Sequence, residues 1–351
     1  MLHGKFGDMR VIVTGNTGYV GSRIGSILRP LATELVGIDT GFFAQNLTAA
    51  KILPEVVFDR HIWSDLRNFD MNYLQGIDAV VHLAAISNDP MGNNFEEVTE
   101  EINTTASARL AVAAKQAGVR RFVFASSCSL YGTAESTPRV ETDPLNPLTA
   151  YARSKASMEK VLNDLADSDF QTTCLRFPTA CGMSPRLRLD LVLNDFVASA
   201  ISTGTIQILS DGTPWRPLID VADMGRAIAW GLTHNEGEPA IRVNVGSNEC
   251  NYQVFQIAET VAQRLPGTKV VVSSDAAPDK RSYKVDFSLY ERLAQGYLPK
   301  YSLTDSIDAV ATGLRSMGFS DTDFRDSGLI RLVSLKNLKK SSNLDDKLYW
   351  I

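Results

Sequence analysis

Residues 9–21 read MRVIVTGNTGYVG, a short run rich in β-branched residues followed by a turn that carries three glycines. The run predicts a buried strand, and residues 22–28 predict a helix that stops near Pro30. Glycines suit the joint, because the backbone must turn tightly and let a phosphate group approach the amides at the helix N-terminus. The stretch therefore predicts a strand, a phosphate-binding turn and a helix, although a plain tight turn would use the same residues.

A second predicted strand, residues 34–39, ends in Asp39, about twenty residues past the glycines. A carboxylate at this place accepts hydrogen bonds from the 2′-hydroxyl of an adenosine ribose and repels a 2′-phosphate. Asp39 thus favours NAD over NADP. The alternative is that Asp39 only caps the next segment.

Further apolar runs predict strands at residues 56–58, 79–83, 122–124, 173–175 and 241–245, with helices at 94–117 and 150–165. Continuous apolar strands that alternate with helices predict a Rossmann-type α/β fold, a doubly wound parallel sheet covered on both faces. We expect a dinucleotide-binding domain over residues 1–176, to which 217–246 return. We assign 177–216 and 247–351 to a smaller, interleaved substrate domain, and the apolar end of 335–351 suits docking back on the fold.

The composition is that of an ordinary globular protein: 351 residues, 44% hydrophobic and 21% charged, with a net charge of −5. The acidic balance argues against nucleic acid as the main partner. The N-terminus lacks the apolar segment of a signal peptide and no run approaches a membrane span, so we expect a cytoplasmic protein. The four cysteines form no CxxC pair and the four histidines are scattered, so neither a disulfide framework nor a metal site is predicted.

Tyr151 and Lys155 are four residues apart on a predicted helix and therefore share one face. A lysine charge near the phenol favours the phenolate, so we expect Lys155 to lower the pKa of Tyr151. The same spacing also occurs by chance on many solvated helices, and the pair gains meaning only from its surroundings.

Residues 124–132, FASSCSLYG, leave a strand with hydroxyl side chains at its carboxyl end, where ligands of open α/β sheets bind. Together with Tyr151 and Lys155, this segment resembles the extended short-chain dehydrogenase/reductase family, in particular its nucleotide-sugar epimerases, dehydratases and reductases. The resemblance covers most of the chain. It implies Ser127, Tyr151 and Lys155 as catalytic residues, with Ser126 as the neighbouring alternative to Ser127.

The same resemblance implies which residues bind NAD. They are Gly15, Thr17, Gly18, Tyr19, Val20, Gly21, Asp39, Asp65, Leu66, Leu83, Ala84, Ala85, Asn103, Tyr151, Lys155 and Pro178.

It also implies residues that bind a nucleoside-diphosphate sugar. Among them are Arg216 and Arg281, whose forked side chains suit phosphate oxygens. The set is Ser87, Asn88, Ser127, Cys128, Ser129, Thr179, Arg188, Arg216 and Arg281. Ser87 and Asn88 fit a helix-capping turn equally well, and Arg188 fits a surface loop equally well.

Two segments depart from the family pattern. Cys128 and Ser129 stand where 4,6-dehydratases carry an acidic pair, so dehydration, which needs an acid and a base, is disfavoured. Cys128 is either an acid for epimerisation or, more commonly for a buried thiol, a packing residue. Thr179 stands near a position where many relatives have asparagine, which weakens the transfer of their substrate contact.

The resemblance implies an NAD-dependent epimerase of a nucleoside-diphosphate sugar that works through a 4-keto intermediate. The alternatives are a 4-ketoreductase that consumes a reduced cofactor and, in a different class, a non-catalytic NAD-binding regulator. Relatives commonly form homodimers through helices such as the one that carries Tyr151. Ala152 and Ala156 on that helix are small enough for close approach of another helix, so we expect a homodimer.

Overall fold

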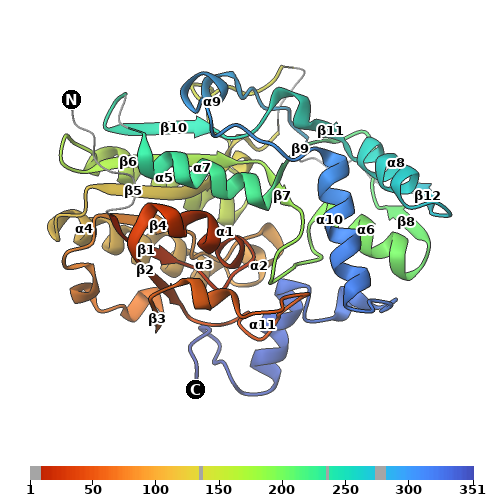
Figure 1. Cartoon of the computed structure of the whole chain (residues 1–351), viewed down its shortest axis with the longest axis horizontal. Coiled ribbons are helices and arrows are strands. Elements are labelled where there is room, and N and C mark those ends of the chain that lie inside the picture. Colours follow the sequence, from red (N-terminus) through yellow and green to blue (C-terminus); the bar gives the residue numbers. More distant parts are fainter. Residues whose placement is uncertain (1–8, 134–136, 235–236, 273–281) are drawn as a thin grey trace.

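Seven parallel strands form the central sheet, in the order β10-β6-β5-β4-β1-β2-β3 (Figure 1). The protein is represented by a computed structural model that describes residues 9–133, 137–234, 237–272 and 282–351. The strands are β1 Met9–Thr14, β2 Ala32–Asp39, β3 Arg60–Trp63, β4 Ala79–His82, β5 Arg121–Ser127, β6 Gln171–Phe177 and β10 Ala240–Asn244. The predicted Rossmann-type fold is confirmed.

Helices cover both faces of this sheet. Successive side chains of each strand point to opposite faces and pack against different helices. Val11 and Val13 of β1 pack with helices α1 (Gly21–Leu28) and α7 (Val221–Thr233). Ile12 packs on the other face with α4 (Ser107–Gln116) and α5 (Ala150–Leu165). The apolar runs of the sequence are therefore strands buried from two sides.

A second cluster of buried side chains forms a smaller body beside the sheet, on the right in Figure 1. Its strands are β7 Thr179–Cys181, β9 Trp215–Asp220 and β11 Asn251–Gln253 in one sheet, and β8 Thr205–Ile208 and β12 Lys269–Val272 in another. Its helices are α6 Val192–Ser202, α8 Val254–Arg264 and α10 Leu303–Ser316. Between its segments, α7 and β10 return to the large sheet.

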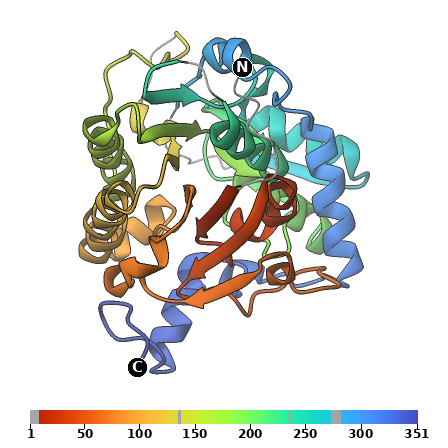
Figure 2. The same ribbon diagram turned by 60° about the vertical axis from the view of Figure 1, so that its left-hand side comes forward.

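The C-terminal segment lies on the half that contains the large sheet and not in the smaller body to which we assigned it. Helix α11 (Arg331–Lys340) and the chain end lie on the β3 side of the molecule in Figures 1 and 2. Leu335, Leu344 and Leu348 are buried in one cluster with Phe42 and Met91. Helix α9 (Ser288–Leu293) also packs on the large core, through Tyr290. Chain order alone does not predict these returns, because the apolar partners are far away in sequence.

One predicted strand differs from the structure. The strand expected at 56–58 is a helical turn, Pro54–Val57, and the strand follows it as β3. Pro54 favours this turn because its ring fixes φ and removes a ladder donor.

The helix expected at 94–117 is present as a continuous helical run over residues 96–116. Helix α2 (Asp89–Asn94) ends at Phe95, whose backbone is not helical, and α3 (Glu96–Glu100) passes through a π-helical stretch into α4. No helix in the described ranges is long and apolar enough to cross a membrane.

Candidate active site

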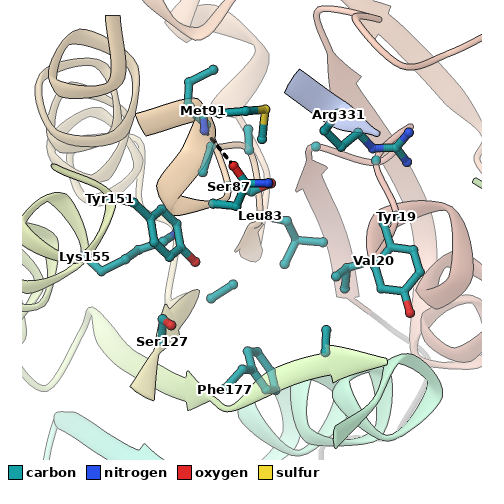
Figure 3. A pocket seen from close by; sticks show the side chains of 18 of the residues that line it. Tyr19, Val20, Leu83, Ser87, Met91, Ser127, Tyr151, Lys155, Phe177 and Arg331 are labelled. Atoms are coloured by element: carbon teal, nitrogen blue, oxygen red, sulfur yellow. Dashed lines mark hydrogen bonds between the residues drawn. The ribbon is translucent and has the colours of Figure 1, made fainter. Parts of the chain in front are cut away.

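A pocket of about 500 Å³ lies at the carboxyl ends of the central strands and reaches into the smaller body (Figure 3). One wall carries Tyr151 and Lys155, and the opposite wall carries Tyr19 and Val20 of the glycine turn. Helix α1 starts directly after this turn, at Gly21. The pocket therefore connects the predicted phosphate-binding turn with the predicted proton-transfer pair.

The turn leaves no room for a side chain at Gly15 or at Gly21. Gly15 has φ +76°, and a Cβ there would lie 2.7 Å from the backbone nitrogen of Ala84. A Cβ at Gly21 would lie 2.1 Å from the carbonyl oxygen of Gly15. Because the turn folds back on itself this closely, its backbone forms the pocket wall and fits a pyrophosphate.

Asp39 is fixed at the pocket edge where β2 ends. One carboxylate oxygen accepts a hydrogen bond of 3.0 Å from the backbone nitrogen of Thr17, and the other accepts one of 2.8 Å from that of Gly41. Asp39 itself lines the pocket. The carboxylate is thus held in place for a ribose hydroxyl, the role that its position predicts.

Asp65 and Leu66 also line the pocket, but the Asp65 carboxylate is already engaged. It accepts hydrogen bonds from the guanidinium of Arg67, the shortest 2.7 Å long, and from the Arg67 backbone nitrogen. Arg67 in turn donates to the carbonyl oxygen of Lys347 at 2.7 Å and lies 3.6 Å from the ring centroid of Tyr349. The chain end is therefore attached at this edge of the pocket.

Tyr151 and Ser127 both line the pocket, on the side that also carries Lys155 in Figure 3. Ser127 is the last residue of β5, and Tyr151 lies in the first turn of α5. Thr149 caps this helix by accepting a bond from the Ala152 nitrogen at 3.1 Å, and its hydroxyl donates to Asp89 at 2.7 Å. The cap positions the phenol at the end of the strand.

Ser126 points to the other face of the sheet. Its hydroxyl donates a hydrogen bond of 2.5 Å to the buried carboxylate of Glu159, which also pairs with Arg176 at 2.7 Å. The alternation of side chains along β5 thus separates the two serines. Ser127, and not Ser126, faces the phenol.

Burial dominates the acid–base properties of the pair. It lowers the pKa of Lys155 to about 7, although Cys174 and Glu159 act in the opposite direction. Burial raises the pKa of Tyr151 to about 12, while the Ser127 hydroxyl and the charge of Arg188 act in the opposite direction. The pKa of Tyr151 therefore lies above its ordinary value and not below it, because burial outweighs the neighbouring charges.

Two predicted cofactor residues do not line the pocket but hold residues that do. Thr17 is buried and gives its backbone N–H to Asp39. The Asn103 amide accepts a hydrogen bond from the Ile86 nitrogen at 2.8 Å and donates to the Ile86 carbonyl at 3.0 Å. Asn103 thereby fixes the segment that follows β4, which contributes Leu83, Ala84 and Ala85 to the wall.

Cys128, predicted to contact substrate, does not line the pocket either. It is fully buried, its thiol donates to the carbonyl oxygen of Arg176 at 3.2 Å, and burial raises its pKa. It is a packing residue, because the helical turn after β5 aims it into the interior. Its neighbour Ser129 does line the pocket, and the Ser129 hydroxyl is buried without a hydrogen-bond partner among the described residues.

Arg188 belongs to a buried polar network at the pocket. Its guanidinium donates to Asp190 at 2.7 and 2.9 Å and to the Ser87 hydroxyl at 3.1 Å. The Asn88 amide donates to the same Asp190 carboxylate at 2.8 Å. Three of the predicted substrate residues are thus brought together, and the surface-loop alternative for Arg188 is wrong.

The remaining predicted residues are placed as follows. Pro178, Thr179 and Arg216 line the pocket, and Arg216 donates to the carbonyl oxygen of Trp215 at 2.9 Å. Arg281 lies outside the described residues. Tyr283 and Arg331 also line the pocket, although the sequence did not single them out as site residues. Within the described ranges, no group of three or more His, Cys, Asp or Glu side chains could hold a metal ion.

Comparison with known proteins places this geometry in a family. The profile described as "NAD dependent epimerase/dehydratase family" matches residues 11–246. A Bacillus subtilis protein described as an uncharacterized UDP-glucose epimerase, YtcB, is 28% identical over 313 residues, which is 85% of this chain and 96% of that protein.

Two solved structures are similar over nearly their whole length. MoeE5, in complex with UDP-glucose and NAD, is 27% identical with a TM-score of 0.75, and the match covers 88% of this chain and 99% of that one. UDP-glucuronic acid 4-epimerase from Bacillus cereus, in complex with UDP-glucuronic acid and NAD, is 25% identical with a TM-score of 0.73 and coverages of 88% and 100%.

Proposed function

The chain belongs to the NAD-dependent epimerase/dehydratase family, and from that premise we propose that it epimerises a nucleoside-diphosphate sugar at C4. The observation that carries the proposal is that Ser127, Tyr151 and the buried Lys155 line one side of a pocket that continues to the glycine turn. This arrangement supports a proton acceptor beside a site for a hydride acceptor.

The residues present fit NAD. The close glycine turn offers its backbone to the pyrophosphate, and the fixed Asp39 carboxylate suits a ribose with a free 2′-hydroxyl. When bound, NAD supplies the group that takes a hydride from the sugar and returns it.

Tyr151 accepts the proton of the C4 hydroxyl, and Ser127 hydrogen-bonds to the reacting oxygen and stabilises its charge. Lys155 lies 4.6 Å from the centroid of the Phe124 ring and 5.6 Å from that of Tyr151. A Lys155 ammonium stabilises the phenolate that the reaction needs. The 4-keto sugar turns in the pocket, and Tyr151 returns the proton after hydride addition on the other face.

The fate of Cys128 supports epimerisation over dehydration. Loss of water from the sugar needs an acid and a base beside C5 and C6. The thiol at this position is buried, faces away from the pocket and keeps its proton because burial raises its pKa. Ser129 is not a base at neutral pH.

The experiment that tests this role of Tyr151 is the Tyr151→Phe substitution. The variant should fold and bind NAD, because the ring still fills the wall, but lose turnover by about 10²- to 10⁴-fold. Turnover of candidate nucleotide sugars is compared with NAD affinity in the same preparation. Near-native turnover with intact NAD binding would contradict the assignment.

A further inference from the structure

Arg331 lies at the pocket although it comes from the C-terminal helix, 180 residues past Tyr151. In Figure 3 it is on the wall opposite Tyr151 and Lys155, on the same side as Tyr19 and Val20 of the glycine turn. It is one of the largest fully buried side chains of the molecule, with 1% of its surface exposed. A buried cation at a ligand pocket requires a partner.

The contacts of Arg331 inside the protein do not supply an anion. Its Nη2 donates to the carbonyl oxygen of Arg186 at 2.7 Å, and its guanidinium carbon lies 4.6 Å from the centroid of the Phe43 ring. Its Nη1 is buried and has no hydrogen-bond partner among the described residues. Burial, followed by the charge of Arg188, lowers the pKa of Arg331 to about 9. Asp190, whose charge acts on Arg331, is already paired with Arg188 at 2.7 Å.

The surroundings of Arg331 connect it to the glycine turn. The Arg186 backbone, which accepts its hydrogen bond, is tied to the Ser184 hydroxyl at 3.3 Å. That hydroxyl donates to the carbonyl oxygen of Tyr19 at 2.6 Å. Phe43, on the other side of the guanidinium, follows β2 and Asp39. These hydrogen bonds therefore link Arg331 to Tyr19 of the glycine turn.

Helix α11 is held in this position by the dinucleotide-binding half itself. Leu335 is fully buried against the Phe42 cluster, and the Ser334 hydroxyl accepts a hydrogen bond from Asn46 at 3.0 Å. The chain end beyond the helix is attached to Arg67 and, through the Trp350 ring nitrogen, to the carbonyl oxygen of Thr40 at 2.7 Å. The arginine is therefore presented by a fixed element and not by a loose tail.

We propose that Arg331 is a ligand of the NAD diphosphate, so that the C-terminal helix completes the dinucleotide site. The free Nη1 donates to a phosphate oxygen, and the anion neutralises a charge that the protein leaves uncompensated. The inference rests on the cofactor of the family and not on which sugar the pocket accepts.

The test compares ligands that contain the diphosphate of NAD with two that do not, adenosine and the substrate nucleotide UDP. Calorimetric dissociation constants are measured for NAD, ADP-ribose, adenosine and UDP with the wild type and Arg331→Gln. The substitution should weaken NAD and ADP-ribose by about 10- to 100-fold, the range expected for a lost charge-assisted contact, with adenosine and UDP changed less than about twofold. Lys336→Gln is the matched control, because it removes an exposed charge from the same helix.

Three results for Arg331→Gln would overturn the proposal. The first is an NAD affinity within about twofold of wild type. The second is an equal loss of adenosine affinity, which indicates a structural role, and the third is a loss of affinity confined to UDP, which assigns Arg331 to the substrate. If Arg331→Gln does not fold, Arg331→Lys keeps the buried charge and carries the same test. It should bind NAD and ADP-ribose about 3- to 10-fold more weakly and adenosine normally, because lysine lacks the forked geometry. Unchanged NAD and ADP-ribose binding by Arg331→Lys would contradict the proposal.

Discussion

The choice between two adjacent serines shows how a strand sets the chemistry at the scale of single residues. The hydroxyl of Ser126 donates to the buried Glu159, whereas Ser127 lies on the same side of the pocket as Tyr151. Because both residues are serines, a comparison of the two tests the effect of position alone.

We predict opposite effects for the two alanine substitutions. Ser127→Ala should lower kcat by about 10²-fold, because it removes a hydrogen bond to the reacting oxygen, and leave stability nearly unchanged. Ser126→Ala should leave kcat within about threefold and lower the free energy of unfolding by about 1 to 3 kcal/mol, because Glu159 loses a buried donor. Steady-state kinetics and urea unfolding of both variants check this. Equal kinetic losses would contradict the assignment of Ser127.

The buried Lys155 predicts a pH-dependent stability. Its pKa is about 7 in the folded chain and 10.5 in the unfolded chain, so between these values only the unfolded chain holds the proton. Stability contributed by this group therefore rises with pH from about 7 to 10.5, and its burial cost is fully present below pH 7.

The Lys155→Met variant removes this cost. In nucleotide-free protein at pH 6 we expect its Tm to exceed that of wild type by several degrees, with the difference shrinking as the pH rises toward 10. Lys160→Met, at an exposed position of the same helix, should show no such trend. A Tm difference independent of pH would show that the lysine is not buried as a cation.

At the scale of elements, the C-terminal segment packs on the half that contains the large sheet, although it lies outside the residues predicted for that half. Trp350 donates to the carbonyl oxygen of Thr40 and packs beside Phe42, with ring centroids 6.0 Å apart. Thr40 directly follows Asp39, so the chain end supports the ribose edge of the pocket.

We therefore expect Trp350→Ala to weaken NAD binding by about fivefold, the equivalent of one hydrogen bond of about 1 kcal/mol. The adjacent Ile351→Ala, at a position that is 83% exposed, should bind NAD like the wild type. Fluorescence titration with NAD measures both. Equal affinities of the two variants would show that the chain end does not support the site.

The elements that follow a repeating pattern were predictable from the sequence. The glycine turn, β1, β2 and the helix Ala150–Leu165 lie where apolar runs, glycines and helical spacing indicate. One failure was local: Pro54 turns a short apolar run into a helical turn.

The site was predictable as far as chemistry and strand ends specify it. Tyr151, Lys155, Ser127, Asp39 and Arg188 all line the pocket. Arg331 was not predicted, because a single arginine in a polar helix has no periodic or motif signal, and only long-range packing brings it to the glycine turn. The pKa of Tyr151 was expected in the wrong direction, because spacing shows a nearby charge but not the depth of burial.

For the whole molecule, we still expect a homodimer, but through a smaller surface of α5 than we expected. Ala152 is 1% exposed and lines the pocket, so it is not available to a partner helix. Ala156 is half-buried, and Val112 on the neighbouring helix α4 is 39% exposed. Light scattering should give twice the chain mass of 38.4 kDa, and Val112→Glu should shift the mass toward one chain. A wild-type monomer would contradict this expectation.

The proposed reaction consumes no cofactor and leaves the mass of the sugar nucleotide unchanged. Epimerisation returns the hydride to the sugar, whereas a ketoreductase consumes reduced cofactor and a dehydratase releases water.

The most direct measurement is NMR analysis of the products formed by the NAD-loaded protein from a panel of UDP-, dTDP-, GDP- and CDP-sugars, both hydroxy and 4-keto. We predict that one hydroxy sugar nucleotide is converted to its C4 epimer, with no added NADH and no change in mass. Conversion only of 4-keto sugars with stoichiometric consumption of NADH or NADPH, or formation of a dehydrated 4-keto product, would contradict the account.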